Sequence, residues 1–358
     1  MKLSKQILLP FLLSLAPQAT TSPTEDLSVQ VGHHVIFSYP GLEPPSHLFD
    51  LVTQGKVGGI ILFGENVGEN LSTTIEQLQN TYRNSPHYAG SPLFVMTDQE
   101  GGQIRRLPGG PESSAKQVGQ ASNPRKAATQ MGKDAASTLE AAKINFNLAP
   151  VLDVYRKPGD FTDHTGRSFS NNSDVVGTCG SAFIKAQQSA GIISSAKHFP
   201  GLGAAGATEN TDLQPVTIDS SLEVLRSVDT APYKKAIAAG VDMVMSSWAI
   251  YPALDAQHPS GFSKAWIQHE LRGRLGFKGV TITDALEAGA LEAFGDDASR
   301  GLLASQAGMD ILLASSRNVT QGESVVDILV ASLKDGSLDM EYFTLGTKRI
   351  MEVRRKIV

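Results

Sequence analysis

The chain has little cysteine and no excess of positive charge. Cys179 is the only cysteine among 358 residues, which excludes an intrachain disulfide and any zinc site made of cysteines. Lysine and arginine together number 31 against 36 acidic residues, which gives a formal net charge of −5. Because no basic run stands out either, nucleic acid is not an expected partner. Hydrophobic residues make up 41% of the chain, which is enough for a sizeable core and unlike a disordered protein.

Long apolar runs are also lacking beyond the N-terminus. The run at residues 7–16 follows Lys2 and Lys5 and precedes small and polar residues, which is the pattern of a secretory signal peptide and is short for a bilayer span. We predict a signal peptide over residues 1–21 and a secreted chain over residues 22–358, with no membrane contact after the peptide is removed. In a secreted protein, Asn-x-Ser/Thr sequons are candidate N-glycosylation sites, and they occur here at Asn70, Asn171 and Asn318.

Short apolar runs alternate with amphipathic segments along the rest of the chain. The candidate strands are residues 35–39, 58–63, 93–97, 146–152, 192–196, 243–247, 279–283 and 310–314. The candidate helices are residues 73–82, 126–143, 175–190, 221–239, 264–275, 298–307, 323–333 and 340–356. Such alternation predicts a parallel sheet with helical crossovers. About eight units in this length favour an α/β fold of the (β/α)8 TIM-like barrel type, with a single catalytic domain, over an open doubly wound sheet.

Polar and charged residues stand where four of these apolar runs stop. They are Asp98, Asp153, the pair Lys197-His198, and Asp284. In a barrel the carboxyl ends of the strands meet at one face, where active sites are built, so we expect these side chains to share a pocket. Carboxylates accept hydrogen bonds from vicinal hydroxyls, while Lys, His and Arg donate to others, which suits a polyhydroxylated ligand. A carboxylate beneath an anomeric carbon can also form a covalent glycosyl intermediate.

Signatures of metal and nucleotide sites are missing or incomplete. There is no HExxH motif and no ligand-like spacing among the eight histidines, so no metal is expected. The segment 201–206 matches G-x-G-x-x-G, but the residues after it do not open a helix whose N-terminus would hold a pyrophosphate. A P-loop sequence is absent. The glycines of this segment are better explained by a tight or mobile loop near the pocket.

These segments resemble glycoside hydrolase family 3, and within it the β-N-acetylglucosaminidase branch. The resemblance rests on the segments 98–102 (DQEGG), 149–154 (APVLDV), 166–169 (GRSF) and 197–201 (KHFPG) and covers nearly all of the secreted chain. It implies one TIM-like barrel without the second domain that many relatives carry. It also implies an exo-acting enzyme that releases terminal β-linked N-acetylglucosamine from a carbohydrate substrate by a retaining double displacement, with no metal or organic cofactor.

The resemblance also assigns roles to individual residues. Asp284 matches the catalytic nucleophile of the family. The positions that match sugar-binding residues are Asp98, Arg106, Arg167, Lys197 and His198.

One loop departs from the family pattern. In the well-known bacterial enzymes of the branch, the loop after KHFPG carries an Asp-x-His pair whose histidine is the acid/base, but no histidine occurs here between His198 and His258. Glu209 is the first substitute, because a carboxylic acid with a raised pKa can protonate a glycosidic oxygen. Asp212 and His164 are the second and third. Two other functions stay open: a carbohydrate-binding barrel that is non-catalytic or weakly active, and a β-glucosidase of the same family.

Overall fold

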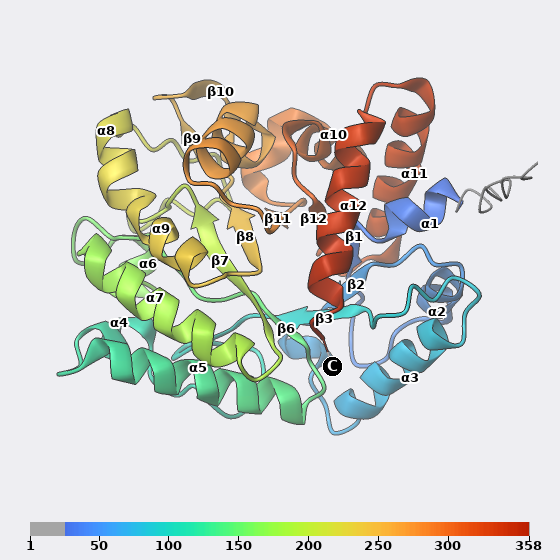
Figure 1. The fold of residues 1–358 in the computed structure, drawn as a ribbon, viewed down its shortest axis with the longest axis horizontal. Coiled ribbons are helices and arrows are strands. Elements are labelled where there is room, and N and C mark those ends of the chain that lie inside the picture. The colour runs from blue at the N-terminus through green and yellow to red at the C-terminus, as the bar shows by residue number, and fades with distance from the viewer. Residues whose placement is uncertain (1–25, 358) are drawn as a thin grey trace, which may run out of the picture.

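A closed barrel of eight parallel strands organises residues 26–357, the part of the chain that the computed structural model describes (Figure 1). The strands follow one another around the barrel in chain order, and β12 pairs with β1 to close it. They are β1 (Val35–Phe37), β2 (Gly59–Ile61), β3 (Phe94–Thr97), β6 (Phe146–Asn147), β7 (Ile193–Phe199), β8 (Met243–Ser246), β11 (Val280–Ala285) and β12 (Ile311–Leu313). Each falls on one of the eight predicted apolar runs, so the TIM-like barrel is confirmed. The predicted signal peptide lies outside the described residues.

The strands differ from the predicted runs at their carboxyl ends. β7 continues through Lys197 and His198, and β11 continues through Asp284. These polar residues therefore lie within the last residues of their strands and not in the loops that follow. β6 instead stops at Asn147, five residues before the predicted end. Pro150 has no N–H to extend the ladder, and beyond β6 only an isolated bridge joins Val151 to Lys197.

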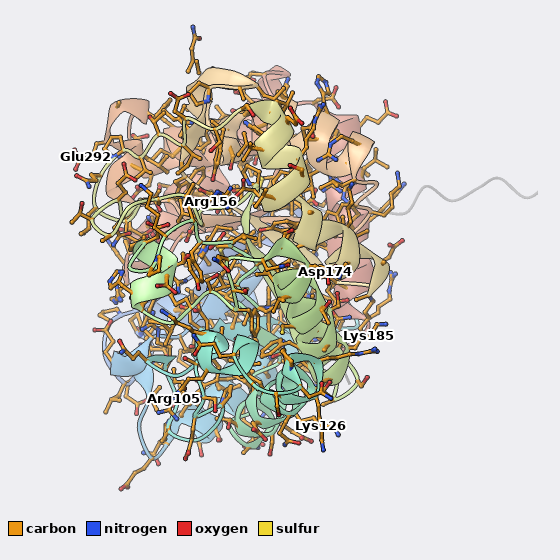
Figure 2. All side chains as sticks on the ribbon, turned by 90° about the vertical axis from the view of Figure 1, so that its left-hand side faces the viewer. Arg105, Lys126, Arg156, Asp174, Lys185 and Glu292 are labelled. Carbon is orange, nitrogen blue, oxygen red and sulfur yellow. The ribbon has the colours of Figure 1, made fainter. Side chains whose placement is uncertain are left out.

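Helices surround the barrel and connect its strands (Figure 1). They are α1 (Leu27–Gly32), α2 (Ser46–Thr53), α3 (Leu71–Arg83), α4 (Ala115–Gly119), α5 (Pro124–Ala141), α6 (Phe161–His164), α7 (Ser173–Gln188), α8 (Leu222–Val224), α9 (Ala231–Ala238), α10 (Asp297–Ala307), α11 (Val319–Asp335) and α12 (Met340–Arg354). Charged side chains such as Lys126 on α5 and Lys185 on α7 lie exposed on this outer layer (Figure 2). None of the helices within residues 26–357 is long and apolar enough to cross a membrane.

Two predicted helices are less regular than the sequence pattern indicates, and four short helices were not predicted. The segment 221–239 divides into α8, a π-helical turn (Leu225–Asp229) and α9, whose first turn contains Pro232. The segment after β8 is a π-helix (Ala265–Arg274). The four short helices that the sequence pattern did not indicate are α1, α2, α4 and α6. Pro232 explains the first difference, because a proline favours the first turn of a new helix over the interior of a continuous one.

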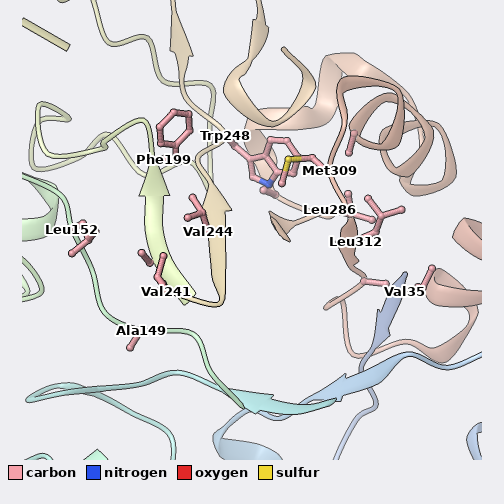
Figure 3. Packing of buried hydrophobic residues seen from close by; sticks show 14 of the residues in the cluster. Val35, Ala149, Leu152, Phe199, Val241, Val244, Trp248, Leu286, Met309 and Leu312 are labelled. Atoms are coloured by element: carbon pink, nitrogen blue, oxygen red, sulfur yellow. The ribbon is translucent and has the colours of Figure 1, made fainter. Parts of the chain in front are cut away.

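Two hydrophobic layers hold the barrel together. Inward-facing residues such as Ile36, Met96 and Ile282 fill its interior, while their neighbours along the strands face the helices. Figure 3 shows part of this outer layer, including Val244 and Leu312. The alternation follows from the two-residue period of a strand, which sends successive side chains to opposite faces.

The amino-terminal end of the barrel is sealed. Ile350 and Val353 of α12 pack against the residues inside the barrel. The adjacent Arg354 is fully buried, and its guanidinium donates hydrogen bonds to the carbonyl oxygens of Ser91 and Pro92 at 3.0 and 2.9 Å. A ligand therefore reaches the barrel only from the opposite end, where the strands finish.

Candidate active site

A pocket of about 380 Å³ opens at the carboxyl ends of the barrel strands. Its apolar lining includes four residues of the barrel, Ile61, Leu148, Met245 and Leu313. Polar side chains from the ends of β3, β7 and β11 and from the loops that follow the strands form the rest. Of the predicted site residues, the pocket brings together Asp98, Arg106, Arg167, Lys197, His198, Asp212 and Asp284.

Lys197 is the central cation of the pocket. Its side chain is 3% exposed, and Nζ lies 2.7 Å from Asp98 Oδ1 and 2.8 Å from Glu100 Oε1. Burial alone lowers the pKa of a lysine, but the two carboxylates outweigh burial and raise the pKa of Lys197. Lys197 therefore stays charged and is held as a hydrogen-bond donor.

Glu100 binds a second cation in the same network. The guanidinium of Arg167 donates from Nε and Nη2 to the two carboxylate oxygens of Glu100, both at 2.8 Å. Burial raises the pKa of Glu100, but Arg167 and Lys197 outweigh it and bring the pKa well below its ordinary value. The pKa of Asp98 is also lowered, because Lys197 and Arg106, 3.4 Å away, outweigh burial. These carboxylates stay ionised and act as fixed acceptors.

His198 is oriented by a carboxylate from the segment that follows the neighbouring strand β6. Its Nδ1 lies 2.7 Å from Asp153 Oδ2, and Asp153 also accepts from the backbone N–H groups of His198 and Leu202. Asp153 is fully buried and its pKa is lowered, since the hydrogen bonds and His198 outweigh burial. The other ring nitrogen, Nε2, lies 3.4 Å from Arg167 Nη2.

Asp284 has no cation bonded to it among the residues described. It is half-buried at the end of β11, and its Oδ1 accepts the backbone N–H of Ala285 at 2.9 Å. Burial raises the pKa of Asp284 and the charge of Asp212 adds to the rise, whereas His198 and Lys197 oppose it; the balance is a raised pKa. Asp284 thus differs from the carboxylates that are paired with Lys197 and Arg167.

The three candidates for the acid/base lie in different surroundings. Glu209 is not among the pocket-lining residues, because its carboxylate turns back to accept the N–H of Gly206 at 2.6 Å. His164, at the end of α6, is exposed and packs beside Phe161 instead of lining the pocket. Asp212 alone of the three faces the pocket. The structure therefore favours the second candidate from the sequence over the first.

The side of the pocket across the barrel from β6 contains residues to which sequence reasoning gave no role. Arg317, in the loop after β12, stacks on the ring of Phe63 at 4.0 Å and forms an ion pair with Glu65 at 2.9 Å. Glu287, in the loop after β11, accepts hydrogen bonds from Ser315 and Gln321. Their positions just after strands were the only signal that the sequence offered.

A TIM barrel with a pocket of this size, rich in carboxylates and lined by cations at the strand ends, has the architecture of a glycosidase. Within residues 26–357, no group of three His, Cys, Asp or Glu side chains is placed to hold a metal ion. The model of the glycosyl hydrolase family 3 N-terminal domain matches residues 29–353. The chain belongs to this family and is a glycoside hydrolase of the β-hexosaminidase-like type.

Individual relatives agree with this assignment. The chain is 54% identical over 343 residues to a protein of Arthroderma benhamiae named an uncharacterized secreted glycosyl hydrolase, and covers 97% of it. It is 36% identical over 292 residues to a β-hexosaminidase of Psychromonas ingrahamii and covers 82% of that protein. Among solved structures, a family 3 β-N-acetylglucosaminidase of Paenibacillus superposes with a TM-score of 0.86 at 30% identity over 94% of this chain, which spans 63% of that protein. A β-N-acetylhexosaminidase of Beutenbergia cavernae, with a TM-score of 0.80 and 29% identity, is covered along its full length.

Proposed function

We propose that the protein is a secreted, exo-acting β-N-acetylglucosaminidase that works by a retaining double displacement. The observation that carries the proposal is Asp284, a carboxylate without a bonded cation that shares one pocket with Lys197, His198 and Arg167. The preference for N-acetylglucosamine rests on relatives that are named β-hexosaminidases and β-N-acetylglucosaminidases.

The pocket divides the work between binding and bond cleavage. Asp98 accepts hydrogen bonds from sugar hydroxyls, and Arg167 and Lys197 donate hydrogen bonds to them. The ion pairs of these three side chains hold them in position before the sugar binds. Asp284 then attacks the anomeric carbon and forms a glycosyl–enzyme ester, which water hydrolyses in the second step. Two displacements return the product in the β configuration.

The size of the pocket supports exo-action. Its volume of about 380 Å³ lies near the lower end of the ~300–1,000 Å³ range of ligand pockets. The apolar barrel residues close its inner end, so one terminal sugar fits and a chain cannot pass through. The rest of the substrate then lies toward the loops at the mouth.

Asp284→Asn tests the assignment of the nucleophile. The variant keeps the shape of the side chain but loses the nucleophilic oxygen, so hydrolysis of 4-nitrophenyl N-acetyl-β-glucosaminide should fall by orders of magnitude while the circular dichroism spectrum is unchanged. Proton NMR of the wild-type reaction should show the β-anomer first. Undiminished turnover by the variant, or the α-anomer as first product, would contradict the proposal.

The same assay separates the alternative functions. Faster hydrolysis of 4-nitrophenyl β-glucoside than of the N-acetylglucosaminide would make the protein a β-glucosidase, and sugar binding without turnover of either would make it a carbohydrate-binding barrel.

Secretion and glycosylation form part of the proposal. The relative from Arthroderma benhamiae is named as secreted, and the sequons at Asn70, Asn171 and Asn318 all lie exposed at or next to the start of a helix. Expression in a eukaryotic host should give medium-borne protein that begins near residue 22 and loses mass on treatment with an endoglycosidase. Retention of the full-length chain inside the cell would contradict secretion.

A further inference from the structure

The loop after β7 folds so that only one ionisable side chain of residues 208–214 reaches the pocket. Glu209 closes a tight turn through two bonds to Gly206: its N–H donates to the Gly206 carbonyl at 2.9 Å, and its carboxylate accepts the Gly206 N–H. Asn210, Thr211 and Asp212 follow and line the pocket. Among these three, only Asp212 has an ionisable side chain that could give or take a proton.

Asp212 is held against the segment that follows the nucleophile strand. The backbone N–H groups of Gly289 and Ala290 donate to the carbonyl oxygens of Asp212 and Thr211 at 2.9 and 3.1 Å. The contact is close enough that a Cβ on Gly289 would lie 2.4 Å from the Leu213 carbonyl oxygen. Because the segment 285–290 begins directly after Asp284, this contact fixes Asp212 relative to Asp284.

The carboxylate of Asp212 is free to handle a proton. Within residues 26–357 it has neither a hydrogen-bond donor nor an ion-pair partner, although the Asp212 backbone N–H is bonded to Asn210 Oδ1. Asp212 is exposed at the mouth of the pocket, where a bound glycoside would cover its side chain. A carboxyl group that a bound glycoside covers lies where it can give a proton to the leaving group.

Two other ionisable side chains of the pocket, Glu287 and His198, are already hydrogen-bonded to protein groups. The carboxylate of Glu287 accepts hydrogen bonds from Ser315 and Gln321, which hold it against the loop after β12. The Nδ1 of His198 is held by Asp153 at 2.7 Å, and its Nε2 lies 3.4 Å from Arg167 Nη2. Neither is arranged to donate a proton to a leaving group.

We propose that Asp212 is the acid/base of this enzyme, in place of the histidine that the loop lacks. The inference rests on the proposed function. In the first step Asp284 forms its bond to the anomeric carbon, the bond to the glycosidic oxygen breaks, and that oxygen takes the proton of Asp212. In the second step the Asp212 carboxylate takes a proton from water, whose oxygen attacks the anomeric carbon and releases Asp284. Each cycle consumes one water and returns both carboxyl groups to their starting states.

A series of leaving groups tests the proposal directly. For Asp212→Asn we expect kcat/KM for N,N′-diacetylchitobiose to fall by ~10²–10⁴-fold, which is the usual size of a general-acid contribution. The value for 2,4-dinitrophenyl N-acetyl-β-glucosaminide should change little, because that leaving group needs no proton. The kcat of the variant on the dinitrophenyl substrate should fall, because the second step has lost its base. Azide, which attacks the anomeric carbon without a base, should restore kcat and yield the β-glycosyl azide.

Two further variants control the experiment. Glu209→Gln should behave as wild type on both substrates, because the amide oxygen can still accept the Gly206 N–H. Gly289→Ala pushes the loop away from the strand that bears Asp284 and should reproduce the selective loss on diacetylchitobiose without removing any carboxylate.

The pH profile gives a readout that a structural role would not move. On Asp284, burial raises the pKa, the charge of Asp212 raises it further, and His198 and Lys197 lower it. Removing the charge of Asp212 should therefore shift the acid limb of kcat/KM for the dinitrophenyl substrate to lower pH. The other charged side chains in the pocket lining are Asp98, Glu100, Arg106, Arg167, Glu287 and Arg317, and they are present in both proteins.

The outcomes distinguish this inference from the proposed function. An equal loss on both substrates in folded Asp212→Asn, or a selective loss in Glu209→Gln instead, would overturn Asp212 as the acid/base while leaving Asp284 as nucleophile. A wild-type protein without glycosidase activity, or an active Asp284→Asn variant, would overturn the proposed function itself.

Discussion

Glu100 is the residue at which the charge network of the pocket can be tested most sharply. Its carboxylate accepts two hydrogen bonds from Arg167 and lies 2.8 Å from Lys197 Nζ. Glu100→Gln preserves the volume of the side chain and one acceptor oxygen. It removes the negative charge that both cations face, so that Asp98 is the only carboxylate still bonded to Lys197.

The expected loss of stability follows from how deeply this network is buried. The side chains of Glu100, Arg167 and Lys197 are 5%, 16% and 3% exposed. Removing one partner of such a buried pair costs ~3–5 kcal/mol, because the other charge stays in the protein without compensation. For a chain of 358 residues, an unfolding entropy of ~2.1 cal/mol/K per residue converts this free energy into a Tm lower by ~4–7 °C.

Thermal unfolding by calorimetry measures the effect, and the chain offers a matched control. Glu76→Gln removes the same charge from the ion pair with Lys143, whose two side chains are about half exposed at 54% and 45%. An exposed pair contributes ~0–1 kcal/mol, so its Tm should change by no more than ~1 °C. The KM of Glu100→Gln should also rise, since Arg167 and Lys197 lose the partner that positions them. Equal Tm values for the two variants would refute the argument that the pocket network is buried and mutually neutralising.

Two smaller predictions concern a buried acid and the far side of the pocket. Burial raises the pKa of Asp229 to about 7 despite its ion pair with Arg156, so the folded state binds the proton more tightly than the unfolded state, and this group's contribution to stability is lost as pH rises from about 4 to 7. Asp229→Asn should flatten that slope in urea unfolding at pH 5 and 8, and an unchanged slope would contradict it. Arg317 lies over Phe63 at the pocket wall; Arg317→Gln should raise the KM for diacetylchitobiose by ~10-fold, the value of one hydrogen bond from a charged donor. Exposed Arg125→Gln is the charge-matched control, and equal KM values for the two would count against a substrate contact.

The barrel was predictable because its strands are short, apolar and regularly separated by helical patterns. All eight runs became strands, since a parallel strand is buried on both faces and reads as a continuous apolar segment. The short helices α1, α2, α4 and α6 were harder to predict, because so few residues show no full helical period. The break at Pro232 was hard because the proline lies inside a long amphipathic segment.

The site was predictable where chemistry lies on the strands themselves. Lys197, His198 and Asp284 lie at fixed points of β7 and β11, so the barrel geometry alone brings them together. Which of Glu209 and Asp212 lines the pocket was not predictable, because it depends on backbone hydrogen bonds between two loops that are far apart in the sequence. Sequence spacing in a loop does not determine which side chain faces inward.

The carboxylates of the site form two groups that differ in pKa, and the difference follows from the presence or absence of a basic side chain bonded to each. Asp98, Glu100 and Asp153 each face a basic side chain within hydrogen-bonding distance, and the pKa of each is lowered. Asp284 has no such partner among the residues described, and burial together with the charge of Asp212 raises its pKa. As pH falls, Asp284 therefore loses its charge before the other three carboxylates do. With Asp284 as the proposed nucleophile, the acid limb of activity should report loss of the nucleophile rather than loss of binding, and should appear in kcat/KM with little change in the affinity for a sugar that binds without reacting.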